Sequence, residues 1–372
     1  MIDFTIFYNS TGLSYFDSSH IIMIIIALII MYIGIQKRYD ALTLIPISFG
    51  MLFANIPGVD QMFQSINYEG TILNIFKQGL TNGIYPALIF IGIGAMTDFT
   101  SLIANPKLMF IGFAAQIGIF TAFMGALLLG FTIYDSATIS VLGSGNAPVI
   151  LFLTSQLNMQ LMAIIGLTIY LLIAFVPIFQ PPIIKLMTTP KERAIQMKEP
   201  RMVSQKERMV YPIIGFIITS LIAPAGAIFL GMFFLGNLLR ECSIVKQLAT
   251  TFRTVMIDIC TILIGLCIGA MASGLVILNK ESYFILFLGI FAFILATASG
   301  IIGAKFLNLF LSDKINPVIG AAGVSVIPGS AKLVDKIGRE NNTLLLEHAM
   351  APSVAGVIGS TVVAGVILGM LG

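Results

Sequence analysis

The segment VLGSGNAPVIL (Val141–Leu151) decides the fold, because it interrupts two long apolar runs with two glycines, an asparagine and a proline. Glycine and proline both break a helix, and proline also lacks a backbone N–H donor. Irregular backbone at membrane depth is tolerated only where protein or a water-filled cavity satisfies its polar groups. The segment therefore predicts a broken helical element that lines a site inside a membrane protein.

The composition is typical of an integral membrane protein. Of its 372 residues, 58% are hydrophobic and 10% are charged, whereas a soluble domain carries about 25% charged residues. Several apolar windows reach or approach the about 20 residues that a helix needs to cross the hydrocarbon core. We expect an all-α polytopic membrane protein whose clearest spans are 20–35, 108–131, 159–179, 254–278 and 353–371.

The basic residues predict the topology. The segment Lys185–Arg208 holds seven lysines and arginines against three acids, and an excess of Lys and Arg is typical of cytoplasmic loops. Lys37 and Arg38 mark a second inside point after the first span, which places the N-terminus outside. We therefore expect a multi-pass membrane protein with the loop 185–208 in the cytoplasm.

An internal duplication accompanies this topology. The string IGAM occurs at 93–96 and again at 268–271, and GSGNAPV at Gly143 has a counterpart in GAAGVSV at Gly320. With the predicted topology, the two halves run in opposite directions, as in inverted-repeat transporters, which bind substrate and ions near the membrane midplane. The chain divides accordingly into an outside segment with the first two spans (1–83), a first repeat with a broken element at 139–156 (84–184), the basic loop (185–208), a short helical pair with a basic loop (209–253), and a second repeat with a broken element at 315–332 (254–372).

The two broken elements carry oxygen-bearing side chains that suit a hard cation. Asn146 and Ser144 lie in the first element, and Asn316 and Ser325 lie in the second. Na⁺ prefers oxygen donors, and unwound helices of secondary carriers supply carbonyl oxygens for it. The alternative is that these side chains only satisfy the broken backbone, and for Asn146 the two interpretations balance.

The other candidates are ionisable. Asp258 lies inside a span, where such groups are functional hypotheses by default, although it is close to the start of that span. Lys332 follows the second broken element and could extend to the membrane surface. The sequence has no phosphate-binding loop, metal-binding cysteine cluster or nucleophile elbow, and no nucleic-acid partner is expected.

The chain resembles the β subunits of sodium-translocating biotin-dependent decarboxylases. The resemblance covers essentially the whole chain and rests on GIGAMTDFTSLIANPK, FVPIFQPP, NPVIGAAGVSVIP and HAMAPSVAGVIGS. It implies a multi-pass subunit of a prokaryotic cytoplasmic (inner) membrane that decarboxylates carboxybiotin and exports Na⁺. The implied partners are a carboxyltransferase α subunit, a biotinyl carrier subunit that supplies the carboxybiotin, and a small single-span membrane subunit. The resemblance also ties Asn316, Gly320 and Ser325 to Na⁺ and coupling.

This sequence departs from the family at several positions. Asn146 stands where relatives carry an aspartate, Lys332 where they carry an arginine, and Ser353 where they carry an asparagine. A tyrosine of the family's proton path falls at Leu172, with Tyr170 two residues earlier. The resemblance therefore assigns Asn146, Tyr170 and Lys332 as catalytic, with an altered ion chemistry.

Three functions stay open from the sequence. The first is decarboxylation of carboxybiotin coupled to Na⁺ export, with the ion at Asn316, Ser325 and Asn146. The second is a stand-alone secondary Na⁺-linked carrier on the same scaffold. The third is a subunit with impaired ion coupling, because Asn146 replaces the aspartate. A homo-oligomer is also left open.

Overall fold

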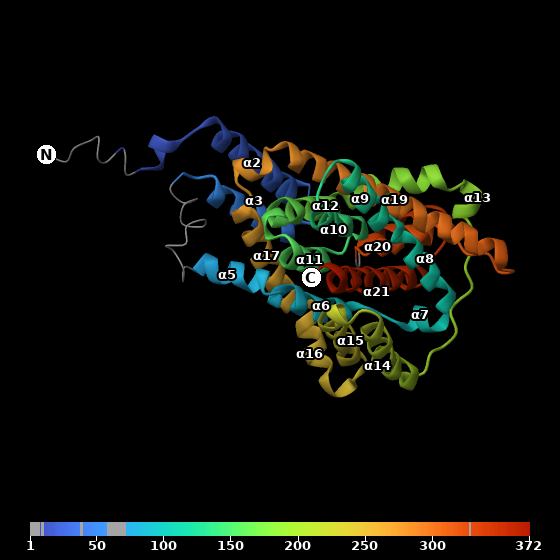
Figure 1. The fold of residues 1–372 in the computed structure, drawn as a ribbon. Coiled ribbons are helices and arrows are strands. Elements are labelled where there is room, and N and C mark those ends of the chain that lie inside the picture. Colours follow the sequence, from blue (N-terminus) through green and yellow to red (C-terminus); the bar gives the residue numbers. More distant parts are fainter. Residues whose placement is uncertain (1–7, 9–10, 38–39, 58–71, 327–328) are drawn as a thin grey trace.

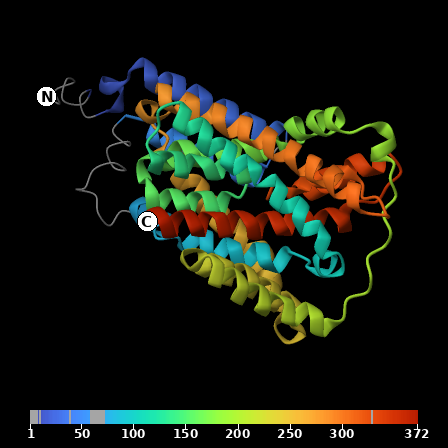
Figure 2. The ribbon, with the colours of Figure 1, turned by 45° about the vertical axis from the view of Figure 1, so that its right-hand side comes forward.

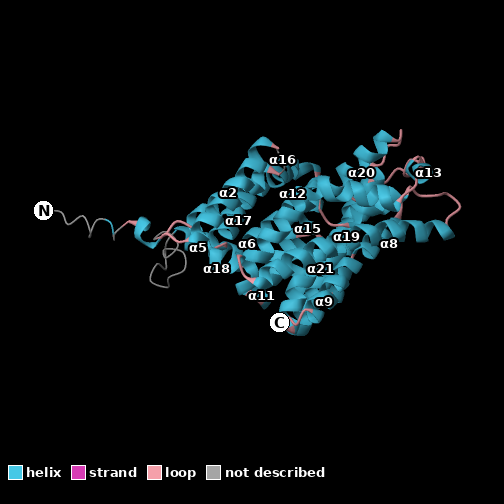
Figure 3. Ribbon diagram, turned by 90° about the horizontal axis from the view of Figure 1, so that it is seen from above, coloured by secondary structure: helices cyan, strands magenta, loops and turns pink. Residues whose placement is uncertain are grey.

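The computed structural model describes residues 8, 11–37, 40–57, 72–326 and 329–372, and all the regular structure in these ranges is helical. Figure 1 shows the helices packed as one elongated bundle, and Figure 3 shows the same bundle from above. The prediction of an all-α polytopic membrane protein is confirmed. The longer helices are α2 (Ser18–Gln36), α3 (Ala41–Ala54), α5 (Ile72–Thr81), α6 (Ile84–Met96), α8 (Met109–Ala115), α9 (Ile117–Leu128), α10 (Ile133–Ser140), α11 (Ala147–Leu157), α12 (Met162–Met187), α14 (Gln205–Ile222), α15 (Ala227–Glu241), α17 (Ile257–Met271), α19 (Lys280–Phe310), α20 (Gly329–Glu340) and α21 (Leu346–Leu371).

Short elements connect these helices. The short α-helices are α7 (Thr100–Ala104), α13 (Pro190–Arg193), α16 (Lys246–Thr251) and α18 (Gly274–Ile277), and η8 (Phe252–Met256) is a π-helical turn between α16 and α17. The 3₁₀ segments include η3 (Pro106–Leu108), η4 (Val141–Ser144), η5 (Met159–Leu161), η6 (Pro224–Gly226) and η9 (Pro317–Gly323).

Six helical segments within the described ranges are long and apolar enough to cross a membrane. They are Ser18–Gln36, Pro106–Leu128, Met159–Met187, Lys246–Met271, Lys280–Phe310 and Leu346–Leu371. A seventh crossing is possible if α5 and α6, which meet at a 60° bend, form one broken span. Their residues are apolar on most faces, as expected for helices that contact both lipid and the protein interior.

The duplicated sequence has a counterpart in the packing. In each half, the glycine of the IGAM string contacts the backbone of a helix from the other half: Gly94 of α6 packs on α15, and Gly269 of α17 packs on α3. The partner helices also contribute a glycine to each contact, namely Gly236 of α15 and Gly50 of α3. A side chain at any of the four would meet backbone atoms, so these helix pairs approach closely only because the positions are glycine.

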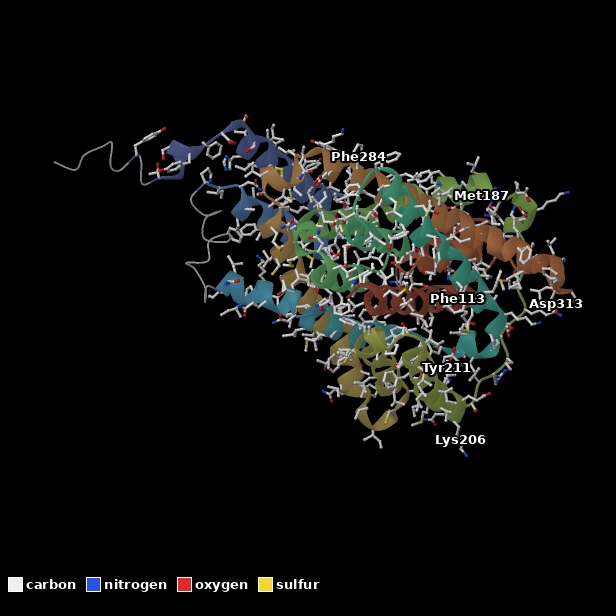
Figure 4. All side chains as sticks on the ribbon, viewed as in Figure 1. Phe113, Met187, Lys206, Tyr211, Phe284 and Asp313 are labelled. Atoms are coloured by element: carbon white, nitrogen blue, oxygen red, sulfur yellow. The ribbon has the colours of Figure 1, made fainter. Side chains whose placement is uncertain are left out.

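The start of α2 and the end of α21 lie on one side of the bundle, and the central loop begins on the other. Figures 1 and 2 show the C-terminal end of α21 on the same side as the start of α2, and α13 on the opposite side. Figure 4 shows Met187, at the end of α12, and Asp313 on that opposite side as well. This is the arrangement that the basic residues predict, and the assignment of the two sides to cytoplasm and exterior stays a prediction.

Candidate functional site

The two broken elements contact each other in the interior. The backbone N–H of Ser325 donates a hydrogen bond of 2.9 Å to the carbonyl oxygen of Ser144. Gly145 follows Ser144 with φ +71°, a conformation that glycine adopts without strain. A Cβ at this position would also lie 2.8 Å from Val324 of the second element. The glycine therefore turns the chain and lets the second element approach.

Each broken element packs closely against another helix through a pair of glycines. Gly143 of η4 lies against the backbone of Gly118 in α9, and Gly320 of η9 lies against the backbone of Gly300 in α19. All four positions exclude a larger side chain, because its Cβ would collide with the facing peptide. Gly320, assigned to coupling by the resemblance, therefore has a packing role in this structure.

Asn146 ties the first broken element to the last helix. Its side chain is 2% exposed, and its Nδ2 donates to Ser360 Oγ of α21 at 2.9 Å. Its backbone N–H donates to Ser144 Oγ at 3.2 Å, and Ser144 Oγ in turn donates to Val141 O at 2.7 Å. With its nitrogen used in this way, Asn146 has its Oδ1 to offer to a cation, and it carries no proton that titrates.

Three residues near Gly356 of α21 have a buried side-chain oxygen without a hydrogen-bond partner in the described structure. A Cβ on Gly356 would lie 2.9 Å from Ser325 Oγ, and Gln116 Nε2 approaches the Gly356 carbonyl oxygen at 3.4 Å. Ser353 lies one turn before Gly356 on the same helix. Gln116 Oε1, Ser325 Oγ and Ser353 Oγ are all buried without a partner in the described structure.

Burying these oxygens without a hydrogen-bond partner costs free energy, and a cation bound to them would remove that penalty. A buried polar atom left unsatisfied costs about 1–3 kcal/mol. Oxygen atoms from an amide and two hydroxyls, next to backbone carbonyls, are donors that a hard cation prefers. Among the described residues, no group of three or more His, Cys, Asp or Glu side chains could hold a metal. The chemistry of this donor set therefore fits a monovalent cation better than a divalent one.

Asn316 lies at the other end of η9 from Ser325. Its Nδ2 donates to the carbonyl oxygens of Arg193 and Ile195 in the central loop, at 2.9 and 3.0 Å. Its Oδ1 accepts from Val318 N at 3.1 Å and so caps η9. The seven residues of η9 rise about 14 Å at about 2 Å each. The structure thus does not bring Asn316 together with Asn146 and Ser325.

Leu172, and not Tyr170, faces the crossing of the broken elements. Leu172 of α12 is buried in a cluster with Val324 and Val326 of the second element. Tyr170 is also buried, but it belongs to a different cluster, because two residues along a helix turn a side chain by about 200°. Leu172, the position at which the resemblance leads us to expect a tyrosine, is therefore an apolar contact in this chain.

The two remaining ionisable candidates lie outside the crossing. Lys332, in the first turn of α20, and Asp258, in the first turn of α17, are exposed. The structure gives neither of them an ion pair or a side-chain hydrogen bond within the described ranges. Neither residue therefore contributes to the cluster around Gly356.

Sequence reasoning missed two glutamines. Gln116, at the junction of α8 and α9, is 4% exposed. Gln180 of α12 is fully buried, and its Nε2 donates to Ala321 O of η9 at 3.2 Å while its Oε1 has no partner in the described part of the chain. The sequence signal for both residues is an uncharged polar side chain inside a predicted span. A reading that considers only ionisable groups in the spans does not select such residues.

These features define a class: a polytopic helical membrane protein in which two broken elements from opposite halves of the chain meet in the interior. Comparison with known proteins gives the family. Residues 19–371 match the family "Na+-transporting oxaloacetate decarboxylase beta subunit". The chain is 42% identical to the methylmalonyl-CoA decarboxylase subunit beta of Propionigenium modestum, over 98% of each chain. It is 36% identical to the oxaloacetate decarboxylase beta chain of Klebsiella pneumoniae, over 96% of each chain.

A third relative is the methylmalonyl-CoA decarboxylase subunit beta of Veillonella parvula, with 40% identity over 98% of this chain and 96% of that protein. The chain therefore belongs to the family of Na⁺-transporting decarboxylase β subunits, as the resemblance in its motifs predicted.

Proposed function

We propose that this chain decarboxylates carboxybiotin, carried by a partner subunit, and couples that step to the export of Na⁺. The observation that carries the proposal is the contact of the two broken elements at Ser144 and Ser325, because Ser325 and the nearby Gln116 and Ser353 have buried oxygens without a partner among the described residues. Membership in the Na⁺-transporting decarboxylase family supports the same activity. In the reaction, the bond between the carboxylate carbon and the biotin nitrogen breaks, CO₂ leaves, and the nitrogen takes up one proton.

The proposed Na⁺ site consists of Gln116 Oε1, Ser325 Oγ and Ser353 Oγ, with Asn146 Oδ1 at its edge. Ser144 holds the second element in register, and Asn316 and Gly320 shape η9 on the far side. The proton taken up by biotin does not pass through the positions of Asn146 and Leu172, because neither an amide nor an alkyl side chain can release and take up a proton. Na⁺ transport without a proton relay at the crossing is therefore the form of coupling that we propose.

The partners follow from the reaction. A carboxyltransferase α subunit would load the biotin, a biotinyl carrier would bring it to the membrane, and a small single-span subunit would complete the complex. The membrane would be the cytoplasmic one, with the loop 185–208 facing the carrier. The choice of acid belongs to the carboxyltransferase, since the β subunit meets only carboxylated biotin.

The test is transport of radioactive sodium into vesicles reconstituted with the complex. We expect Na⁺ uptake only when carboxybiotin is present and CO₂ is released. CO₂ release that is independent of Na⁺, with no uptake, would contradict the proposal and favour a subunit with impaired coupling. Na⁺ movement down its gradient without carboxybiotin would favour the stand-alone Na⁺-linked carrier.

A further inference from the structure

A basic cavity lies at one end of α14 and α15, away from the crossing of the broken elements. Its volume is about 340 Å³, and α6, α14, α15, α16 and η8 contribute to its lining. Four cations line it, namely Arg208, Arg240, Lys246 and Arg253, and they face two acids, Asp98 and Glu241. The cavity therefore holds two positive charges in excess.

Ion pairs account for the two arginines nearer the core. Arg240 NH2 lies 2.7 Å from Asp98 Oδ2, and Arg208 Nε lies 2.9 Å from Glu241 Oε2. Lys246 and Arg253 are exposed, and the structure records no ion pair for either within the described ranges. The excess charge of the cavity is thus carried by two cations that are free to bind an anion.

An apolar groove lies near this cavity, along the seam between α14 and α15. Its volume is about 520 Å³, and its lining includes Pro212, Phe216, Ile228, Gly231, Leu235 and Leu238. Arg208 lies one turn before Pro212 on α14, and Leu238 lies one turn before Glu241 on α15. On both helices the lining of the groove thus ends one turn from the lining of the basic cavity.

The dimensions of the groove match an acyl chain. From Ala227 to Leu238 the groove follows α15 for eleven residues, which is about 16 Å at 1.5 Å per residue. Half of a hydrocarbon core is about 15 Å thick. Figures 1 and 2 show α14 and α15 at the outer edge of the bundle, and Figure 4 shows Lys206 of α14 pointing outward from it.

We propose that this surface binds one anionic phospholipid, with its phosphate between Lys246 and Arg253 and one acyl chain in the α14–α15 groove. A phosphate placed between two basic side chains is satisfied by charge-assisted hydrogen bonds. Basic pockets between membrane helices on the cytoplasmic side bind acidic headgroups in the same way. Charge complementarity at one end and an apolar lining at the other select a lipid over a free anion or a zwitterionic lipid.

The experiment measures retained lipid after purification of the whole chain in detergent and exchange with phosphatidylglycerol or phosphatidylcholine. We expect the parent protein to retain phosphatidylglycerol selectively. The double variant Lys246→Gln/Arg253→Gln should retain about tenfold less of it, because each basic side chain near the membrane surface attracts the anionic headgroup. The matched control is Lys191→Gln/Lys336→Gln, which removes the same charge from exposed positions elsewhere and should retain lipid as the parent does. Arg253→Lys, which keeps the charge, should retain most of it.

A second variant tests the groove without touching the charges. Gly231→Leu fills the groove and should lower retention of phosphatidylglycerol, while inorganic phosphate should fail to displace the lipid. Equal retention of both lipids, displacement by phosphate alone, or unchanged retention in Gly231→Leu would overturn the proposal. Loss of a membrane partner subunit in Gly231→Leu, with lipid retention intact, would assign the groove to that subunit instead.

Discussion

The backbone N–H of Ser325 donates to the carbonyl oxygen of Ser144, which joins two broken elements from opposite halves of the chain. This bond holds the two unwound segments in a fixed register. The hydroxyl of Ser325 lies beside Gly356 and has no hydrogen-bond partner within the described part of the chain. The proposed coupling of Na⁺ binding to decarboxylation rests on this direct contact between the two elements.

The first prediction concerns the oxygens around Gly356. Gln116→Ala or Ser325→Ala should raise the Na⁺ concentration needed for half-maximal decarboxylation by about tenfold, which corresponds to about 1.4 kcal/mol for one lost ligand. The control is Ser48→Ala, a fully buried serine whose hydroxyl bonds to Ile45 O in its own helix. An unchanged Na⁺ requirement in both site variants would remove these residues from the ion site.

The second prediction concerns the amide at position 146. Asn146→Asp adds a negative charge, and unit charges about 4 Å apart attract by about 4 kcal/mol at an effective dielectric constant of 20. Na⁺ should then bind more tightly, and its binding should weaken on acidification as the carboxyl takes up a proton. The half-saturating Na⁺ concentration of parent and variant, compared at about pH 6 and pH 8, measures this. Identical behaviour of the two proteins would mean that the first broken element is only structural.

The third prediction separates two roles of Asn316. Its side-chain nitrogen holds the central loop at Arg193 and Ile195, so Asn316→Ala should increase tryptic cleavage of that loop several-fold while leaving the Na⁺ requirement unchanged. Asn341→Ala, which removes an amide in the turn after α20 that bonds to Ile337 O of that helix, serves as control. A raised Na⁺ requirement with unaltered cleavage would return Asn316 to the ion site.

The fourth prediction is a pH dependence outside the spans. Burial alone would raise the pKa of Asp98, but hydrogen bonds from Thr100 and the charge of Arg240 outweigh it and hold the pKa below the ordinary 3.8. A carboxyl whose pKa is lower in the folded protein than in the unfolded protein stabilises the fold at pH values above its unfolded-state pKa. This stabilisation is lost as the pH falls through the folded-state pKa.

Asp98→Asn should therefore lower the free energy of unfolding at neutral pH by about 1 kcal/mol or less, because the pair is partly exposed. The difference from the parent should shrink below the ordinary pKa of 3.8. Thermal unfolding in detergent across this range measures it, with the exposed Asp258→Asn as control. A difference that persists undiminished at low pH would assign Asp98 a role other than its charge.

The fifth prediction is topological. A reporter inserted between Lys185 and Arg208 should read cytoplasmic, and one at the C-terminus should read external, because Figures 1 and 2 show them at opposite ends of the bundle. The same side for both reporters would contradict the inverted arrangement of the two halves.

The sequence by itself determined the features that depend on local composition. Hydropathy alone specifies helices in lipid, and the glycines and proline of Val141–Leu151 specify where the helix breaks, since both effects act on the backbone within a few residues. The motif strings were enough to predict the family.

Tertiary structure decided which side chains meet. Gln116 reaches Gly356, Leu172 instead of Tyr170 faces the second broken element, and Asn316 turns to the central loop. Each of these contacts joins segments far apart in the sequence, so it depends on how helices pack and rotate against one another. Local propensity carries no information about that, and glycine contacts such as Gly143 with Gly118 set it in three dimensions.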